Sequence, residues 1–78
     1  MIAAPVLPVP VKSTLLSSVA YDVRQSILDL QFCEGAIYRY FAVPPTIVGQ
    51  LLAADSKGSF FNRHIRNYFR YICLKPNR

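Results

Sequence analysis

Three arginines near the C-terminus of this chain are spaced as if they shared one face of a helix. Arg63, Arg66 and Arg70 stand at positions i, i+3 and i+7, with Lys57 before them and Lys75 after them. A guanidinium group binds phosphate oxygens through two parallel hydrogen bonds, so such a row suits the backbone of a nucleic acid. A solvated surface or a contact with another protein would also explain the row. We take the five residues as candidate contacts to nucleic acid.

The distribution of charge favours the first interpretation. The 78 residues carry a formal net charge of +5. Residues 1–56 hold three basic and four acidic side chains, whereas residues 57–78 hold six basic side chains and no acidic one. A solvated surface usually mixes the two signs, so this basic segment favours a polyanionic partner. We expect DNA or RNA, held through its phosphates with little sequence specificity. The alternative is a protein-interaction module that binds no nucleic acid.

Two tyrosines around a basic residue form a second candidate site. Tyr38, Arg39 and Tyr40 are consecutive in the sequence. Aromatic rings can stack on the bases of a single strand, which contributes about 1–3 kcal/mol per base. The same two rings can instead belong to the hydrophobic core. Arg39 joins the candidate contacts to nucleic acid.

Residues suited to catalysis are few and lie far apart in the sequence. The chain has one histidine, His64, and two cysteines, Cys33 and Cys73, and their spacing is not that of a zinc site. No glycine-rich phosphate loop is present. A Cys–His nucleophile pair is the one catalytic arrangement that the composition leaves open. We therefore expect no enzyme activity, no cofactor, no metal site and no small-molecule substrate.

Apolar and polar residues alternate, or apolar and aromatic residues gather, in three segments. Val19–Arg24 and Ile27–Cys33 show the alternation that is typical of strands, and Ala36–Val43 is rich in aromatic residues. A turn that contains Gly35 separates the last two segments, since glycine adopts positive φ without strain. The three segments predict an antiparallel meander.

The length of this turn determines which side chains face the core. A two-residue turn would place Arg39 opposite a leucine on the apolar face. A three-residue turn over Cys33–Gly35 places Arg39 opposite Asp29, and places Tyr38 and Tyr40 opposite leucines of the preceding strand. The second register pairs opposite charges and keeps one face apolar, so we expect it.

Two short helices are predicted after the strands. Pro45–Ala54 begins with a proline, which suits a first helical turn, and repeats apolar residues at helical spacing. A second helix is expected over Ser59–Tyr68, capped by Ser56 or Ser59. Tyr68–Leu74 either contains the end of this helix or forms a short fourth strand. The fold class expected is α+β: an antiparallel three-stranded meander and two short helices, with the fourth strand as an option.

Size and composition complete these expectations. A chain this short buries only about 60% of its unfolded surface when it folds alone, yet 53% of its residues are hydrophobic. We therefore expect part of the apolar surface to meet a second copy in a homodimer. The prolines of residues 1–12 predict a flexible arm before a single domain at residues 13–78. No signal peptide, membrane span or disulfide framework is visible, which favours the cytoplasm and no membrane partner.

Four stretches of the sequence carry a resemblance to a known family. They are Ala20-Tyr21-Asp22, Ile37-Tyr38-Arg39-Tyr40-Phe41, Val43-Pro44, and Ala54–Asn62 followed by Ile65-Arg66. Over Ser17–Cys73 the chain resembles the KTSC domain family, whose members are short bacterial proteins or tails of some lysyl-tRNA synthetases. The resemblance implies a proposed nucleic-acid-binding role, with no catalysis and no cofactor. The residues on the family pattern are Tyr38, Tyr40, Ser56, Lys57, Gly58, Asn62 and Arg66.

Overall fold

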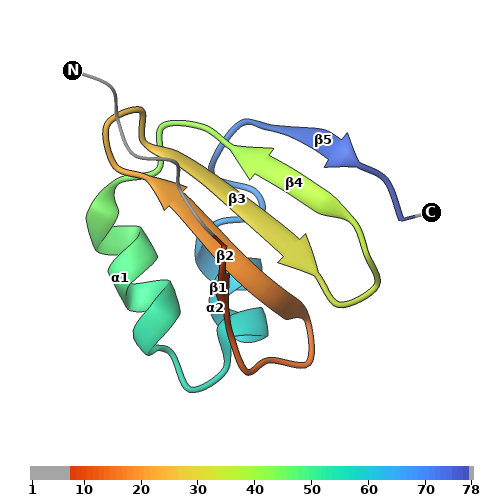
Figure 1. The fold of residues 1–78 in the computed structure, drawn as a ribbon. Coiled ribbons are helices and arrows are strands. Elements are labelled where there is room, and N and C mark those ends of the chain that lie inside the picture. The colour runs from red at the N-terminus through yellow and green to blue at the C-terminus, as the bar shows by residue number, and fades with distance from the viewer. Residues whose placement is uncertain (1–7, 78) are drawn as a thin grey trace.

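The computed structural model describes residues 8–77, which form one sheet and two helices (Figure 1). The strands are β1 (Val9–Pro10), β2 (Leu16–Asp22), β3 (Ile27–Phe32), β4 (Ile37–Tyr40) and β5 (Tyr71–Lys75), and the helices are α1 (Pro45–Ala53) and α2 (Lys57–His64). Each strand pairs antiparallel with the next along the chain, in the order β1-β2-β3-β4-β5. The α+β class is confirmed. The expected sheet of three strands with an optional fourth understates the sheet, which has five.

The additional strand, β1, is short and contains a proline. Val9 pairs with Val19, and Pro10 pairs with Ser18, at the edge of the sheet. Proline has no N–H to donate to a neighbouring strand, so within a sheet it is tolerated in an edge strand. A strand that contains proline is therefore difficult to predict from the sequence. The strand lies within the predicted arm, the first seven residues of which lie outside the described residues.

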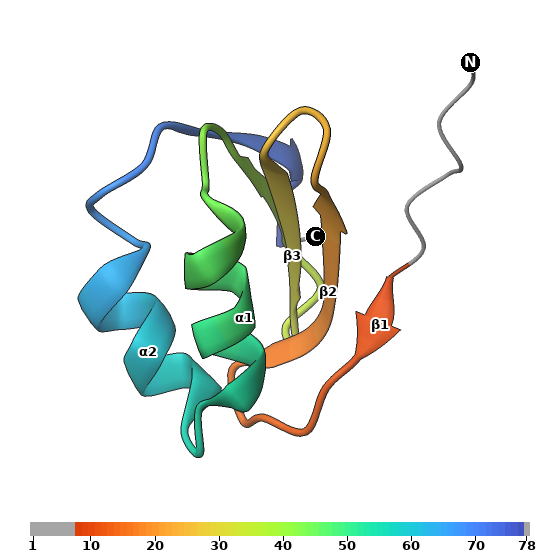
Figure 2. The ribbon, with the colours of Figure 1, turned by 90° about the vertical axis from the view of Figure 1, so that its left-hand side faces the viewer.

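Both helices lie on the same face of the sheet, as Figure 2 shows. The side chains that point from the sheet toward the helices form the core, because alternate residues of a strand face opposite sides. Leu28 and Leu30 on β3 are fully buried, and they pack with Leu51 of α1 and with Phe61 of α2 in one cluster. The Tyr21 hydroxyl donates to the Val43 carbonyl and so ties β2 to the segment before α1.

The predicted three-residue turn between β3 and β4 is confirmed. The Phe32 N–H donates to the Ala36 carbonyl at 2.8 Å, and the Gly35 N–H donates to the Phe32 carbonyl at 2.9 Å. Gly35 has a φ of +113°, a conformation that favours glycine. The register of β3 and β4 is therefore the expected one, with Arg39 opposite Asp29 and both tyrosines opposite leucines.

The second helix begins and ends earlier than expected. Ser56 caps it, and its Oγ accepts a hydrogen bond from the Ser59 N–H at 3.2 Å, so α2 starts at Lys57. At the other end, the Phe61 carbonyl accepts from both the Ile65 and Arg66 N–H groups, at 3.0 and 2.9 Å. The chain then leaves the helix, and Ile65 is completely buried. The expected span of residues 59–68 is wrong at both ends, which changes where the arginines lie.

Two further boundaries differ from the sequence-based ones. β2 starts at Leu16 and ends at Asp22, and Val23 is exposed in the turn that follows. The optional last strand is present as β5, which pairs with β4 at the opposite edge from β1. No helix among residues 8–77 has the length and apolar character needed to cross a membrane.

Candidate nucleic-acid interface

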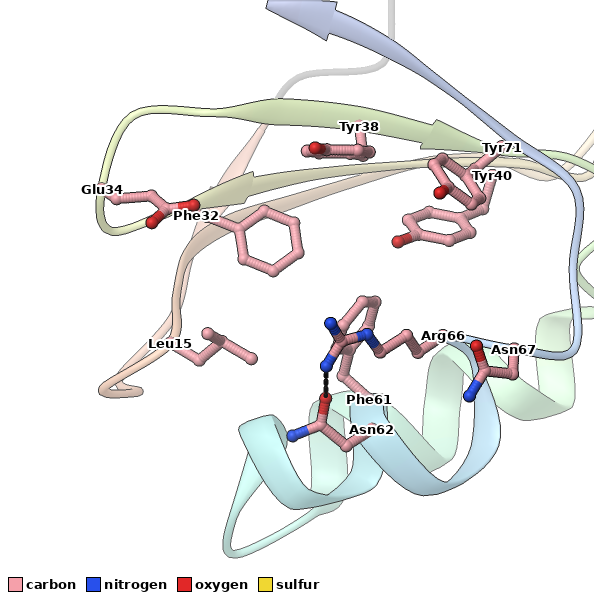
Figure 3. Close-up of a pocket in the computed structure, with 10 residues that line it drawn as sticks. All are labelled: Leu15, Phe32, Glu34, Tyr38, Tyr40, Phe61, Asn62, Arg66, Asn67 and Tyr71. Carbon is pink, nitrogen blue, oxygen red and sulfur yellow. Dashed lines mark hydrogen bonds between the residues drawn. The ribbon is translucent and has the colours of Figure 1, made fainter. Parts of the chain in front are cut away.

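A cleft of about 500 Å³ lies between α2 and the side of the sheet formed by β3, β4 and β5 (Figure 3). The aromatic wall comes from the strands, with Phe32, Tyr38, Tyr40 and Tyr71, and from α2, with Phe61. The other parts are polar and come from α2, the turn after it and the β3–β4 turn: Asn62, Arg66, Asn67 and Glu34. Volumes of this size accommodate small planar ligands or single nucleotides.

The aromatic wall is a continuous set of ring contacts. Tyr71 lies 5.5 Å from Tyr38 and 5.4 Å from Tyr40, measured between ring centroids. Phe61 contacts Phe32 at 5.3 Å and Tyr40 at 5.7 Å in edge-on geometry. Aromatic pairs at these separations stabilise one another beyond the effect of burial alone. The rings are therefore held in place before any ligand binds.

Burial divides these tyrosines into two roles. Tyr40 is only 3% exposed and belongs to the core, as the register argument predicts. Tyr71 on the edge strand is 53% exposed, and the exposure of Tyr38 is intermediate between those of Tyr40 and Tyr71. The faces available for stacking on a base are thus those of Tyr71 and Tyr38 rather than that of Tyr40.

The Tyr40 phenol is held in its neutral form. Burial, with smaller contributions from the neighbouring Tyr71 and Tyr38, raises the pKa of Tyr40 to about 12, while Arg66 acts in the opposite direction. At neutral pH the hydroxyl therefore offers both a donor and an acceptor. The Arg66 side chain lines the same cleft.

Arg66 is the predicted contact that the structure brings into the cleft. It follows the end of α2, and its Nη1 donates to the Asn62 Oδ1 at 3.3 Å (Figure 3). Within residues 8–77 the one ion pair joins Arg39 to Asp29, so Arg66 has no acidic partner there. Its charge faces the tyrosines across open space and is available to an anionic ligand.

The other two arginines of the predicted row lie near the cleft but do not line it. Arg63 is exposed in the last turn of α2, and Arg70 is exposed just before β5. The Arg70 carbonyl accepts from the Phe41 N–H at 2.9 Å, which fixes its backbone beside β4. The expected stripe along one helix is wrong, because the helix ends at His64 before Arg66 and Arg70 are reached.

The remaining candidate residues are spread over the molecule. The Lys57 Nζ donates to the Ala54 carbonyl at 3.0 Å, so this side chain caps the end of α1. Lys75 ends β5 and is exposed at the sheet edge. Arg39 points to the face of the sheet away from the helices, where it pairs with Asp29 at 2.8 Å. None of these three residues lines the cleft.

Among the cleft residues to which sequence reasoning assigned no functional role are Tyr71, Glu34 and Asn67. Tyr71 was placed in an optional strand, and its alternation with Cys73 was the signal that it faces the same side as Tyr38 and Tyr40. Glu34 and Asn67 carry no local signal, since they reach the cleft from turns. The two cysteines, Cys33 and Cys73, are both free and exposed. Among residues 8–77 no three His, Cys, Asp or Glu side chains are grouped to hold a metal ion.

Comparisons with known proteins find similar proteins in several bacteria. A crystal structure of a KTSC domain protein from Yersinia pestis superimposes with a TM-score of 0.87 at 31% identity, covering 90% of this chain and 99% of that one. A protein of Stutzerimonas stutzeri is 47% identical over 64 residues, which are 81% of this chain and 90% of that protein. A protein of Tsukamurella paurometabola is 42% identical over 65 residues, 83% of this chain and 97% of that protein.

A longer protein also contains a matching segment. The lysine–tRNA ligase of Nostoc punctiforme is 32% identical over 60 residues, which are 77% of this chain but only 11% of the ligase. The match to the family model itself covers residues 12–69, which include every helix and the strands β2, β3 and β4. With this match and the structural likeness, the chain belongs to the KTSC domain family.

Proposed function

We propose that this protein binds single-stranded nucleic acid, with a base against the tyrosines of the cleft and phosphates on the surrounding arginines. The observation that carries the proposal is the placement of Arg66 opposite the partly exposed Tyr38 and Tyr71 in one cleft. Single-strand binders combine aromatic stacking surfaces with cations that follow the backbone. A duplex keeps its bases stacked inside, so a cleft of this kind favours an unpaired strand.

The arginines next to the cleft are placed to contact the phosphate backbone of the bound nucleic acid. Arg63 and Arg70 are exposed on either side of Arg66 in sequence, and neither has an ion-pair partner among residues 8–77. Charges that are not neutralised within the protein attract phosphates and release the counterions condensed on them. Phosphate contacts do not distinguish sequences, so most of the affinity is expected to be independent of sequence.

RNA is the more plausible strand, given where related segments occur. Lysine–tRNA ligases, whose names identify tRNA as their substrate, carry a segment that matches 77% of this chain. We therefore place RNA before DNA as the ligand of this protein.

A binding titration tests the proposal. Fluorescence anisotropy with a labelled oligouridine decamer, the corresponding thymidine decamer and a decamer duplex, at about 50 mM salt where phosphate contacts are strongest, measures the three affinities. We expect both single strands to bind more tightly than the duplex. Tyr71→Ala and Arg66→Gln should weaken single-strand binding.

Matched substitutions outside the cleft are the controls. Tyr68→Ala removes a ring that is 70% exposed but does not line the cleft, and Arg24→Gln removes a charge from the β2–β3 turn. Both should bind like the wild type. If the wild type binds none of the three nucleic acids, the proposal is wrong and the protein-interaction module takes its place.

We further propose that the protein forms a homodimer through β5. All five residues of this outermost strand are exposed, including Tyr71, Ile72 and Leu74. An edge strand leaves backbone N–H and C=O groups unpaired, and exposed apolar side chains on it favour pairing with another strand. The same surface would serve the alternative function as a protein-interaction module.

Sedimentation equilibrium tests the dimer. The wild type should have twice the 8.8 kDa mass of the chain at micromolar concentration. Ile72→Thr keeps the β-branched side chain but removes apolar surface from β5, so it should shift the equilibrium to the monomer. Val23→Thr makes the same change in an exposed turn and should leave the dimer intact. A folded wild-type monomer at these concentrations would contradict the proposal.

A further inference from the structure

Glu34 is the one acidic residue among those that line the cleft, and its position needs an explanation. It projects from the β3–β4 turn at the end of the cleft beyond Tyr38, whereas Arg66 enters from the α2 side (Figure 3). No ion pair joins Glu34 to Arg66 or to any other described residue. A carboxylate repels phosphates, so in a site for nucleic acid it is suited to contact a base instead.

The backbone fixes the position of Glu34. The turn that carries it is closed by the hydrogen bond from the Gly35 N–H to the Phe32 carbonyl, at 2.9 Å. The Cys33 N–H donates to the Leu15 carbonyl, also at 2.9 Å, which anchors the turn to the segment before β2. The carboxylate therefore stands on a rigid support beside the aromatic wall.

The two oxygens of a carboxylate accept hydrogen bonds and donate none above the carboxyl pKa. Within residues 8–77 no hydrogen bond to the Glu34 side chain is found, so both oxygens are free to accept from a ligand. Among the bases, guanine presents two adjacent donors on its Watson–Crick edge, the ring N–H and the amino group. Uracil presents one donor there, and adenine and cytosine present one amino group beside an acceptor.

We propose that the cleft selects guanine at one position of the bound strand, with Glu34 accepting from the two donors on the base edge. The ring of the base stacks on Tyr38, which lies nearer to Glu34 than Tyr71 does (Figure 3), and Arg66 binds an adjacent phosphate. This inference rests on the proposed function and adds a specificity to it. Glu34 then determines which base enters the cleft, while the arginines determine the overall affinity.

Oligouridine decamers with a single central substitution test this selection by fluorescence anisotropy. The decamer with one guanosine should bind about tenfold more tightly than oligouridine, as expected for one bidentate contact to a base. Inosine lacks the amino group and should lose most of this gain. Replacing the guanosine by its 7-deaza analogue leaves the Watson–Crick edge unchanged and should retain the gain.

Two variants with the same change in charge assign the effect to Glu34. Glu34→Gln presents a donor beside its single acceptor oxygen, so the preference for guanosine over uridine should fall below about threefold. Its affinity for oligouridine should stay the same or rise. Asp55→Asn changes an exposed carboxylate in the loop between the helices and should keep the full preference.

The possible results separate the two proposals. Equal binding of the guanosine and uridine decamers by the wild type would overturn the selection of guanine but leave single-strand binding standing. A preference that persists in Glu34→Gln would overturn the role of Glu34. A wild type that binds neither decamer would overturn both proposals, and the controls with thymidine and duplex DNA would show the same failure.

Discussion

Arg39 lies directly opposite Asp29 across β3 and β4, and the two side chains form a bidentate pair. The Arg39 Nε is 2.8 Å from one carboxylate oxygen, and its Nη2 is 2.9 Å from the other. The hydrogen bond to Asp29 raises the pKa of Arg39 above its ordinary value. The pair lies on the face of the sheet that the helices leave uncovered, so it fixes the register without taking part in the cleft.

A double-mutant cycle measures what this pair contributes to stability. The side chains are 37% and 26% exposed, so solvent screens their attraction. We expect a coupling free energy of about 0.5–1 kcal/mol between Arg39→Ala and Asp29→Ala in urea unfolding. Binding of single strands should be unchanged in Arg39→Ala if the variant is folded. A loss of binding would place Arg39 in the interface after all.

Tyr40 should be required for folding, whereas Tyr71 should be required for binding. Tyr40→Ala removes a ring that is almost fully buried, so the free energy of unfolding should fall by about 3–5 kcal/mol. Tyr71→Ala removes a ring on the open edge and should leave thermal unfolding close to that of the wild type. Circular dichroism melts beside the anisotropy titration separate the two effects. An unchanged melt for Tyr40→Ala would contradict its place in the core.

The stability of the protein should fall in strong base. The pKa of Tyr40 is about 12 in the folded state and about 10 in an unfolded chain. Because the folded pKa is the higher one, this contribution is fully present below pH 10 and is lost as the pH rises toward 12. The linkage amounts to about 2–3 kcal/mol.

Urea unfolding at pH 8, 9, 10 and 11 checks this dependence. Tyr40→Phe has no ionisable hydroxyl and should lose less stability than the wild type between pH 10 and pH 11. Tyr68→Phe alters an exposed ring and should follow the wild type. Parallel curves for the wild type and Tyr40→Phe would show that Tyr40 does not control the alkaline transition.

The start of α2 depends on one hydroxyl. Ser56→Ala removes the oxygen that accepts from the Ser59 N–H, and such a loss typically destabilises a protein by about 1 kcal/mol. Ser59→Ala is the matched control, because its backbone N–H is retained. Chemical unfolding of the two variants should give a decrease for the first and little change for the second. Equal effects would mean that the cap is not formed.

The salt dependence of binding should show how many phosphates the protein contacts. If Arg63, Arg66 and Arg70 each meet one phosphate of a single strand, log K should fall with log salt with a slope of about −2. Arg66→Gln should reduce the magnitude of that slope by about 0.7. Arg24→Gln should leave it unchanged. A slope near zero in the wild type would exclude backbone contacts as the source of affinity.

Local features of the sequence determine the parts of the fold that could be predicted. The β3–β4 register follows from a turn of known length, an opposite-charge pair and two tyrosines facing leucines, all within about a dozen residues. The first helix follows from its proline and its apolar spacing. β1 could not be predicted, because Val9 and Pro10 acquire strand structure only through their partners on β2.

The cleft could be predicted only in part, because residues far apart in the sequence form it. Helical spacing continues past His64, yet the helix ends there, and the buried Ile65 that follows has a non-helical φ of −120°. Arg66 is thereby turned toward the tyrosines instead of standing in a row with Arg63. Tyr71 lines the cleft with Arg66 only because β5 returns beside β4 after both helices.

In the connection over Cys33–Gly35, the number of residues is as important as their types. Deleting one residue there would shift β4 by a single position, and every side chain on it would change faces. Tyr38 and Tyr40 would point to solvent, and Arg39 would point into the leucine layer. For folding, the connection should accept many substitutions that keep glycine at its end, but neither an insertion nor a deletion of one residue. The length of this turn thus decides whether the protein has a cleft.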